Sequence, residues 1–172
     1  MSMVGNLRRV SETKLAALLA EPAGIMDFLY EEEGSPDAGD EAAYADLDID
    51  KSWHALHYLL NGSAWGTRGA LGFFVGDGRE IGDDDVGYGP ARGFTNAEVR
   101  MIAAELEPLT PARLLAAYDP KAMNTAEIYP HGWPEDPEEA HLTDYIVDYF
   151  EQMKQFIVGA AAQGEALIVY LN

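Results

Sequence analysis

Residues 47–60 have the sequence Leu-Asp-Ile-Asp-Lys-Ser-Trp-His-Ala-Leu-His-Tyr-Leu-Leu, which brings one Trp, two His and a carboxylate pair into one turn and a short helix. At its start, Asp residues alternate with Leu47 and Ile49 in a short pattern of period two. From about Ser52 the apolar residues recur with the period of a helix, and Asp50 or Ser52 is the predicted cap. We expect the rest of the chain to be a scaffold for this helix.

The helical wheel places His57 inside the apolar stripe of this helix and His54 on its flank. The residues on the apolar side are Trp53, Leu56, His57, Leu59 and Leu60. A His in such a stripe is more often a core residue that bonds a backbone carbonyl than a ligand or a base. The functional alternative is that His54 and His57 direct two imidazoles into a pocket floored by Trp53, where either could be a general acid or base.

Two metal motifs resemble this segment, and both fail at required positions. The alternating Asp residues imitate the start of a calcium loop, but Lys51 stands where a Gly is needed and His57 where a bidentate Glu is needed. The His-x-x-His spacing also differs from the zinc-binding His-Glu-x-x-His helix, and it lacks the carboxylate. A zinc site would need His131 to come in from elsewhere, and we predict no metal.

The middle of the chain predicts a loop and then a hairpin. Asn61 to Gly69 is rich in Gly, Ser and Thr, as expected of a loop, and it holds Trp65. Leu71 to Val75 predicts a strand that turns at Gly76 to Gly78 and returns from Arg79 to Gly82. The glycines here are spaced G-x-G-x-x-x-G with no obvious helix after them, which excludes a dinucleotide loop, so we predict no cofactor.

A second glycine-rich segment surrounds Tyr88 and Arg92 with three Gly and one Pro, directly after the acidic triplet at 83–85. Glycines permit close approach of the backbone to a ligand, while Tyr supplies a stacking face and Arg a rigid fork of donors. This pattern is typical of a binding loop. It is equally typical of a tight turn in which Arg92 pairs with a nearby Asp.

The segment Ile128 to Pro134 concentrates Tyr129, His131 and Trp133 between prolines, which stiffen it. A rigid aromatic loop is either a lid over a pocket or a plug over the edge of a core.

The two ends of the chain predict strands, each joined to a helix. Met3 to Val10 predicts a strand, followed by a helix with Ser11 as its cap. Toward the other end, Asp136-Pro137 predicts the start of the longest helix, which Gly164 ends. The continuous apolar run Ala166 to Leu171 predicts a strand inside the sheet.

Further caps predict the helices between them. Thr95 and Glu98 form a capping box, and Thr110-Pro111 and Asp119-Pro120 each combine a cap with Pro at the first helical position. Pro22 predicts the start of a second short helix near the N-terminus.

Five segments together resemble the YfbM-like family of uncharacterised bacterial proteins, and the resemblance spans nearly the whole chain. They are Met3 to Leu7 (Met-Val-Gly-Asn-Leu), Leu47 to Gly62, Gly87 to Arg92 (Gly-Tyr-Gly-Pro-Ala-Arg), Ile128 to Pro130 and Val169 to Leu171. The resemblance implies a single α+β domain in the bacterial cytoplasm. It implies no activity that could be transferred to individual residues.

We therefore predict an α+β fold with a single domain over residues 1–172. A small mixed sheet would combine the N-terminal strand, the middle hairpin and the C-terminal strand, packed by several helices. These include the Trp53 helix and one long C-terminal helix that is followed by the final strand. Residues of about 31–46 are rich in like charge and predict a solvated acidic loop.

The charge balance is strongly acidic, with 30 Asp and Glu against 11 Lys and Arg and a formal net charge of −19. Such a field disfavours binding to nucleic acid and to anionic membranes, and it favours association with a basic protein partner. The chain has no Cys, which excludes a disulfide framework and a thiol nucleophile. The N-terminal residues lack the apolar region of a secretory signal, so we expect a cytoplasmic protein.

No spacing in the sequence matches a catalytic or cofactor signature, so two functions of different classes stay open. The first is an acidic protein-binding or inhibitory module, which needs no catalytic residues. The second is a small-ligand-binding protein or enzyme, in which His54 or His57 is the acid or base and Arg92 holds an anionic group. The pocket of this second function would gather Trp53, His54, His57, Tyr88, Arg92 and His131. The sequence does not decide the oligomeric state.

Overall fold

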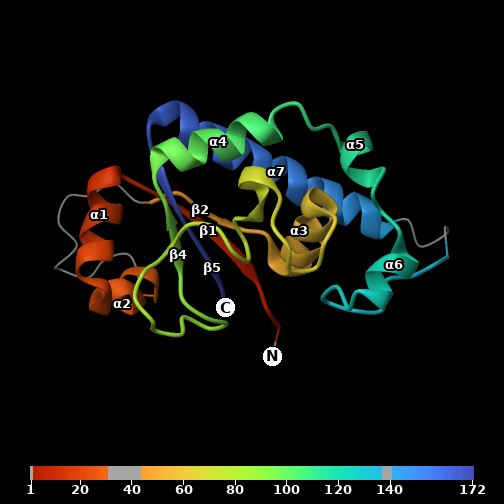
Figure 1. Ribbon diagram of the computed structural model, residues 1–172, viewed down its shortest axis with the longest axis horizontal. Coiled ribbons are helices and arrows are strands. Elements are labelled where there is room, and N and C mark those ends of the chain that lie inside the picture. Colours follow the sequence, from red (N-terminus) through yellow and green to blue (C-terminus); the bar gives the residue numbers. More distant parts are fainter. Residues whose placement is uncertain (1, 31–43, 137–140) are drawn as a thin grey trace.

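The computed structural model describes residues 2–30, 44–136 and 141–172, and its centre is a sheet of five strands (Figure 1). The strand order is β2-β1-β5-β4-β3. The strands are β1 (Gly5–Val10), β2 (Asp46–Asp48), β3 (Arg79–Glu80), β4 (Arg92–Phe94) and β5 (Ala166–Leu171). Most of the predicted acidic loop at about 31–46 lies outside the described residues, and its last residue, Asp46, opens β2.

The final strand β5 lies at the middle of the sheet, which confirms the prediction from its apolar sequence. It pairs with β1 over six residues, from Gly5 opposite Leu171 to Val10 opposite Ala166, and with β4 on its other edge. The prediction of a mixed sheet is wrong, because every described pair of strands is antiparallel. The central strands β1 and β5 pair antiparallel along their whole length, and β2 and β4 pair antiparallel with them on either side.

Helices cover both faces of the sheet, and their combination with antiparallel strands confirms the α+β class. On one face lie α3 (Trp53–Asn61), α4 (Asn96–Leu106) and α7 (His141–Gln163), and on the other lie α1 (Glu12–Ala20) and α2 (Ile25–Tyr30) (Figure 1). Side chains of β5 alternate between the two faces. Leu167 and Val169 join the core under α3, α4 and α7, whereas Ala166, Ile168 and Tyr170 join the core under α1 and α2.

Most predicted helix starts are confirmed by their cap hydrogen bonds. The Ser11 hydroxyl accepts from the Lys14 amide, and Thr95 forms the full capping box with Glu98. Thr110 and Asp119 cap α5 (Pro111–Leu115) and α6 (Pro120–Thr125) in the same way. A 3-10 turn, η1 (Pro22–Gly24), precedes α2.

The long helix α7 is described from His141, so its predicted start at Asp136-Pro137 reaches residues outside the described part. It ends before Gly164, which has a φ of 74°, as predicted. None of the helices in the described ranges is long and apolar enough to cross a membrane.

The predicted strand at Leu71 to Val75 is wrong. This segment forms the 3-10 helix η3 (Gly69–Gly72) and a following turn. Consecutive residues Phe73 and Phe74 are both buried in one core, which a strand with alternating faces could not achieve. The strand β3 at Arg79–Glu80 pairs with β4 instead.

The predicted cap of α3 is confirmed in position only, because Ser52 is the N-cap residue but its side chain makes no capping hydrogen bond. Ser52 donates its hydroxyl to the Ile49 carbonyl, and Asp50 begins the 3-10 helix η2 (Asp50–Ser52) with a φ of 48°. The Asp50 carboxylate accepts a hydrogen bond from the Tyr145 hydroxyl at 2.9 Å. Asp50 therefore ties the start of α3 to α7 and does not cap it.

Candidate functional site

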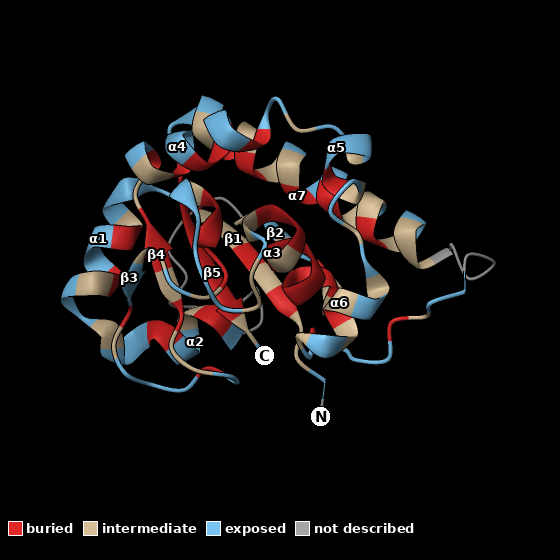
Figure 2. Cartoon of the chain, turned by 45° about the vertical axis from the view of Figure 1, so that its right-hand side comes forward, coloured by how far each residue is buried: buried red, intermediate tan, exposed pale blue. Residues whose placement is uncertain are grey.

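Helix α3 is buried on nearly every side, and Figure 2 shows it red along most of its length. Trp53 and His54 are each 1% exposed, and His57 is 0% exposed. Gly5 of β1 makes the close approach possible, because a Cβ atom there would lie 2.7 Å from the Cβ of Trp53. The backbone of β1 therefore packs directly against the start of α3.

The ring of His54 uses both nitrogens within the protein. Its Nε2 lies 2.9 Å from the Ala64 carbonyl oxygen, and its Nδ1 accepts the Tyr129 amide at 3.0 Å. A carbonyl only accepts and an amide N–H only donates, so this His is the neutral tautomer with its proton on Nε2. Burial is the main cause that lowers its pKa, and the nearby His131 lowers it further against the opposing bond to Ala64.

The ring of His57 has the same arrangement one turn further along α3. Its Nε2 lies 3.1 Å from the Gly66 carbonyl oxygen, and its Nδ1 lies 3.2 Å from the side-chain amide nitrogen of Asn61. Burial, helped by the charge of His54, lowers its pKa to about 4 against the bond to Gly66. His57 is thus neutral near pH 7, in the core position that the sequence predicted for it.

The two carbonyls that accept these bonds lie on either side of Trp65, in the loop 61–69. The same loop is fixed by Asn61, whose side-chain oxygen accepts the Arg68 amide at 2.7 Å and whose amide group donates to the Leu71 carbonyl at 2.9 Å. The Ser63 hydroxyl accepts the Gly66 amide at 2.9 Å. The loop is therefore held at several points around one aromatic residue.

Trp65 is 65% exposed although its backbone is held in this way. Its ring centroid lies 4.6 Å from that of His54 and 6.4 Å from that of Trp53, which itself stacks on His54 at 4.8 Å. We predicted the loop but did not propose Trp65 as a site residue. The signal available in the sequence was a large aromatic residue among Gly, Ser and Thr.

The aromatic segment 128–134 packs beside this group. Trp133 is 4% exposed and donates its indole N–H to the Ile128 carbonyl at 2.8 Å, so this part covers the edge of the core as a plug. The Tyr129 ring stacks on Trp53 at 6.2 Å, and its hydroxyl accepts the Met3 amide at 3.0 Å. His131 is exposed and meets the Tyr129 ring edge-on at 6.0 Å.

The structure divides the six predicted site residues into two groups. Trp53, His54, His57 and His131 share one region, linked by ring contacts and by the effects of neighbouring charges on pKa. Within the described residues, no hydrogen bond, ion pair or ring contact joins these four residues to Tyr88 or Arg92.

Arg92 lies on β4 and pairs with Glu80 of β3 at 2.7 Å, directly across the two strands. The interpretation of this segment as a tight turn required Arg92 to pair with a nearby Asp. Arg92 does pair with a carboxylate, but the carboxylate belongs to a Glu. Tyr88 is 39% exposed, and its amide donates to the Leu171 carbonyl. The Asp85 carboxylate accepts the Gly87 and Gly89 amides at 2.8 Å each, and these bonds lower its pKa.

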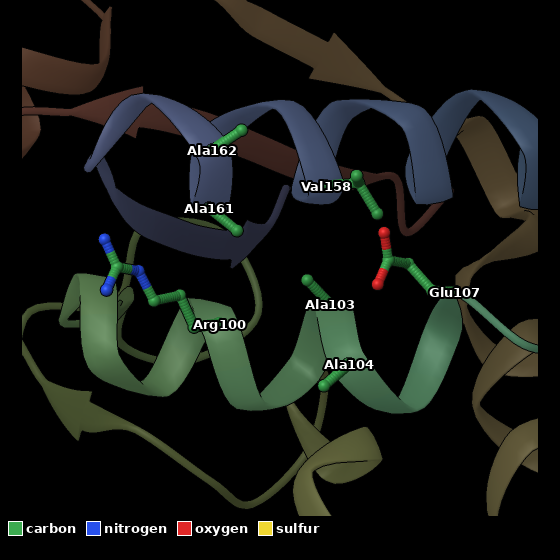
Figure 3. Close-up of a pocket in the computed structure, with 7 residues that line it drawn as sticks. All are labelled: Arg100, Ala103, Ala104, Glu107, Val158, Ala161 and Ala162. Carbon is green, nitrogen blue, oxygen red and sulfur yellow. The ribbon is translucent and has the colours of Figure 1, made fainter.

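A surface groove of about 360 Å³ lies between α4 and α7 (Figure 3). Arg100 and Glu107 bring the only charged side chains to it, and its other lining residues are Ala103, Ala104, Val158, Ala161 and Ala162. None of the predicted site residues lines this groove. Nowhere in the described ranges do three His, Asp or Glu side chains come together in a way that could hold a metal ion.

Comparison with known proteins identifies the family of this chain and a solved structure with the same fold. The model of a family described as a domain of unknown function, DUF1877, matches residues 1–170. The crystal structure of YfbM from Escherichia coli, a protein of unknown function, superposes with a TM-score of 0.74 at 23% identity, covering 98% of this chain and 99% of that one. No curated protein matches the sequence. At this identity the solved structure shows the fold alone.

Proposed function

The chain belongs to the DUF1877 family, a domain of unknown function, and we propose, from the charges on its surface, that it is an acidic protein-binding module. The resemblance to the YfbM-like family is thereby confirmed. The proposed partner is a basic protein met in the cytoplasm, and binding would inhibit or sequester it. The whole chain of 172 residues would act as one domain.

The observation that carries this proposal is that basic side chains, which are few, are engaged in contacts within the protein. Arg8, Arg9 and Arg92 are each paired with a carboxylate, and Lys154 donates to two backbone carbonyls of the segment after α4. These contacts engage basic side chains in a protein that has 30 acidic and only 11 basic side chains. The exposed surface is left with a negative field that attracts basic proteins and speeds their association.

One acidic surface combines carboxylates with aromatic rings, and we call it the α7 face. It consists of Asp144, Tyr145, Asp148, Tyr149 and Glu151, and the three carboxylates are exposed at helical spacing. The two Tyr rings meet edge-on at 5.0 Å. Burial, and then the charges of Asp50 and Asp48, raise the pKa of Tyr149, so these two carboxylates also lie close to it. Carboxylates around aromatic rings suit Lys and Arg side chains.

The alternative is a small-ligand-binding protein or enzyme built on the predicted pocket residues. The observation that favours it is that burial lowers the pKa of both His54 and His57, with His131 lowering that of His54 further and His54 lowering that of His57 further. For catalysis, His54 or His57 would have to release a backbone carbonyl, since both ring nitrogens of each are engaged. The catalytic assignment of these two residues stays a prediction.

The test of the binding module is a titration of labelled nona-arginine peptide, followed by fluorescence anisotropy at about 0.15 M salt. The Asp144→Asn/Asp148→Asn/Glu151→Gln variant should bind roughly 5- to 30-fold more weakly than the wild type, and added salt should weaken both. The matched control, Asp27→Asn/Asp83→Asn/Asp84→Asn, removes the same charge from exposed residues on the α1 and α2 side. Absence of binding by the wild type, or equal loss in both variants, would contradict the proposal.

A further inference from the structure

We infer that Trp65 is the aromatic anchor of the binding surface, on which an Arg side chain of the basic partner stacks. This inference rests on the protein-binding role proposed above and names the residue and the partner chemistry that would make binding specific. Three observations carry it: the exposure of the ring, the rigidity of its loop, and the charge of the protein.

The exposure of Trp65 sets it apart from the other Trp residues. Its side chain is 65% exposed, whereas Trp53 and Trp133 are 1% and 4% exposed. An indole left in water forgoes the favourable burial of a large apolar surface. Trp is also the residue type most enriched among the few positions that dominate the energy of protein interfaces.

The loop that carries Trp65 is fixed before any partner arrives. The carbonyl groups of Ala64 and Gly66, directly before and after it, accept hydrogen bonds from His54 and His57. The indole also rests against the His54 ring, with centroids 4.6 Å apart and planes inclined by 39°. An anchor that is already ordered loses little conformational entropy on binding, which is the advantage of a preorganised interface.

The charge of the protein selects the chemistry of the partner. With a net charge of −19 the surface repels acidic partners and attracts basic ones. Among basic side chains, Arg has a planar guanidinium that stacks on the face of an indole, and Trp is the best aromatic residue for this contact. The His54 ring under the indole is neutral, because its hydrogen-bonding pattern leaves one proton on the ring, so it does not repel the incoming cation.

Carboxylates that could pair with the rest of a basic partner lie on segments bonded to the end of the Trp65 loop or to His54. Glu105 of α4 accepts the Ala70 amide at 2.9 Å, which ties α4 to the end of the Trp65 loop. The exposed Glu127 precedes Tyr129, whose amide is bonded to His54. The Trp65 ring and the α7 face both contact residues at the start of α3. His54 beneath the indole and Asp50, which accepts the Tyr145 hydroxyl, lie at the same end of α3.

The experiment compares nona-arginine and nona-lysine peptides, each labelled and titrated at about 0.15 M salt. Trp65→Ala should bind nona-arginine roughly 5- to 20-fold more weakly than the wild type, and Trp65→Phe should lie between them. The matched control is Met101→Ala, since Met101 of α4 is 60% exposed and should leave the affinity unchanged. The wild type should prefer nona-arginine, and Trp65→Ala should lose most of that preference.

The outcomes separate this inference from the proposed function. If the wild type binds neither peptide, the proposed function fails. If the α7-face variant binds weakly but Trp65→Ala binds like the wild type, the binding role stands and the anchor is overturned. Sedimentation that shows a dimeric wild type and a monomeric Trp65→Ala would also overturn it, because a second copy would then cover the ring. Equal urea midpoints for Trp65→Phe and the wild type establish that the variant is folded.

Discussion

The Nε2 atom of His57 lies 3.1 Å from the carbonyl oxygen of Gly66, so a buried imidazole donates a hydrogen bond to the backbone of the residue directly after an exposed Trp. His54 does the same for Ala64, the residue directly before that Trp. The two His therefore act as a pair that fixes one loop on α3. Their neutrality is a condition of this arrangement, since Nδ1 of each ring faces a donor.

The first prediction concerns the pH dependence of stability. The pKa of His57 falls from 6.5 to about 4 on folding. Between these two pH values, His57 is protonated in the unfolded chain and neutral in the folded chain. The contribution of His57 to stability is therefore complete above pH 6.5 and is lost as the pH falls toward 4. Between pH 7 and 4.5 the wild type should lose roughly 2 kcal/mol more than His57→Gln in the free energy of unfolding. Urea titrations at both pH values measure this difference, and equal losses would contradict the assignment.

The second prediction concerns Asn61, which links His57 to its loop. Asn61→Ala removes the acceptor of the Arg68 amide and the donor to the Leu71 carbonyl, and should cost about 1–3 kcal/mol of stability. Hydrogen exchange should become faster at the Gly66 and Arg68 amides. Asn124→Ala is the matched control, because Asn124 fixes Trp133 through two backbone bonds in the plug. It should destabilise the protein without faster exchange at those two amides, and similar exchange in both variants would argue against a local clamp.

The third prediction concerns the contact between β1 and α3. A Cβ atom at Gly5 would lie 2.7 Å from the Cβ of Trp53 and 3.0 Å from Ile49, so Gly5→Ala should force the strand and the helix apart. The expected cost is about 1–3 kcal/mol. Gly24→Ala is the control, since no atom lies within 4 Å of its added methyl group, and it should change stability by less than about 0.5 kcal/mol. Equal melting temperatures for the two variants would contradict this packing.

The fourth prediction concerns fluorescence. Only Trp65 of the three Trp residues is accessible to solvent, at 65% against 1% and 4%. Acrylamide should therefore quench a large part of the wild-type emission and very little of the emission of Trp65→Phe. The maximum of Trp65→Phe should lie at shorter wavelength, as expected of buried indoles. Strong quenching of the variant would show that Trp53 or Trp133 is open to solvent.

The elements that the sequence predicted well are those specified by local signals. The cap residues Ser11 and Thr95, the end of α7 at Gly164 and the apolar run of β5 are each readable within a few residues. The predicted strand at Leu71 to Val75 failed because the burial of neighbouring Phe residues depends on α3 and α4. Strand order depends on pairing between β1 and β5, which lie at opposite ends of the chain.

The candidate site was predictable only in part, for the same reason. The apolar stripe of α3 indicated that His57 is a core residue, but the burial of His54 follows from the loop and from Tyr129. Arg92 and Tyr88 looked suitable for the same pocket because of their residue types. The sheet places Arg92 opposite Glu80 instead, and register of this kind is not contained in a local pattern.

The measurement that tests the account most directly is a pH titration of the imidazole nitrogens of His54 and His57 by NMR, from pH 8 to 4.5. The account predicts that both rings carry their proton on Nε2, that burial holds the pKa of His54 below its ordinary 6.5 and that His57 titrates at about 4. The amides of Ala64 and Gly66 should keep their shifts over the same range while both rings stay neutral. A ring protonated on Nδ1, or a His57 that titrates at pH 6–7, would contradict the claim that two neutral His hold the loop of Trp65.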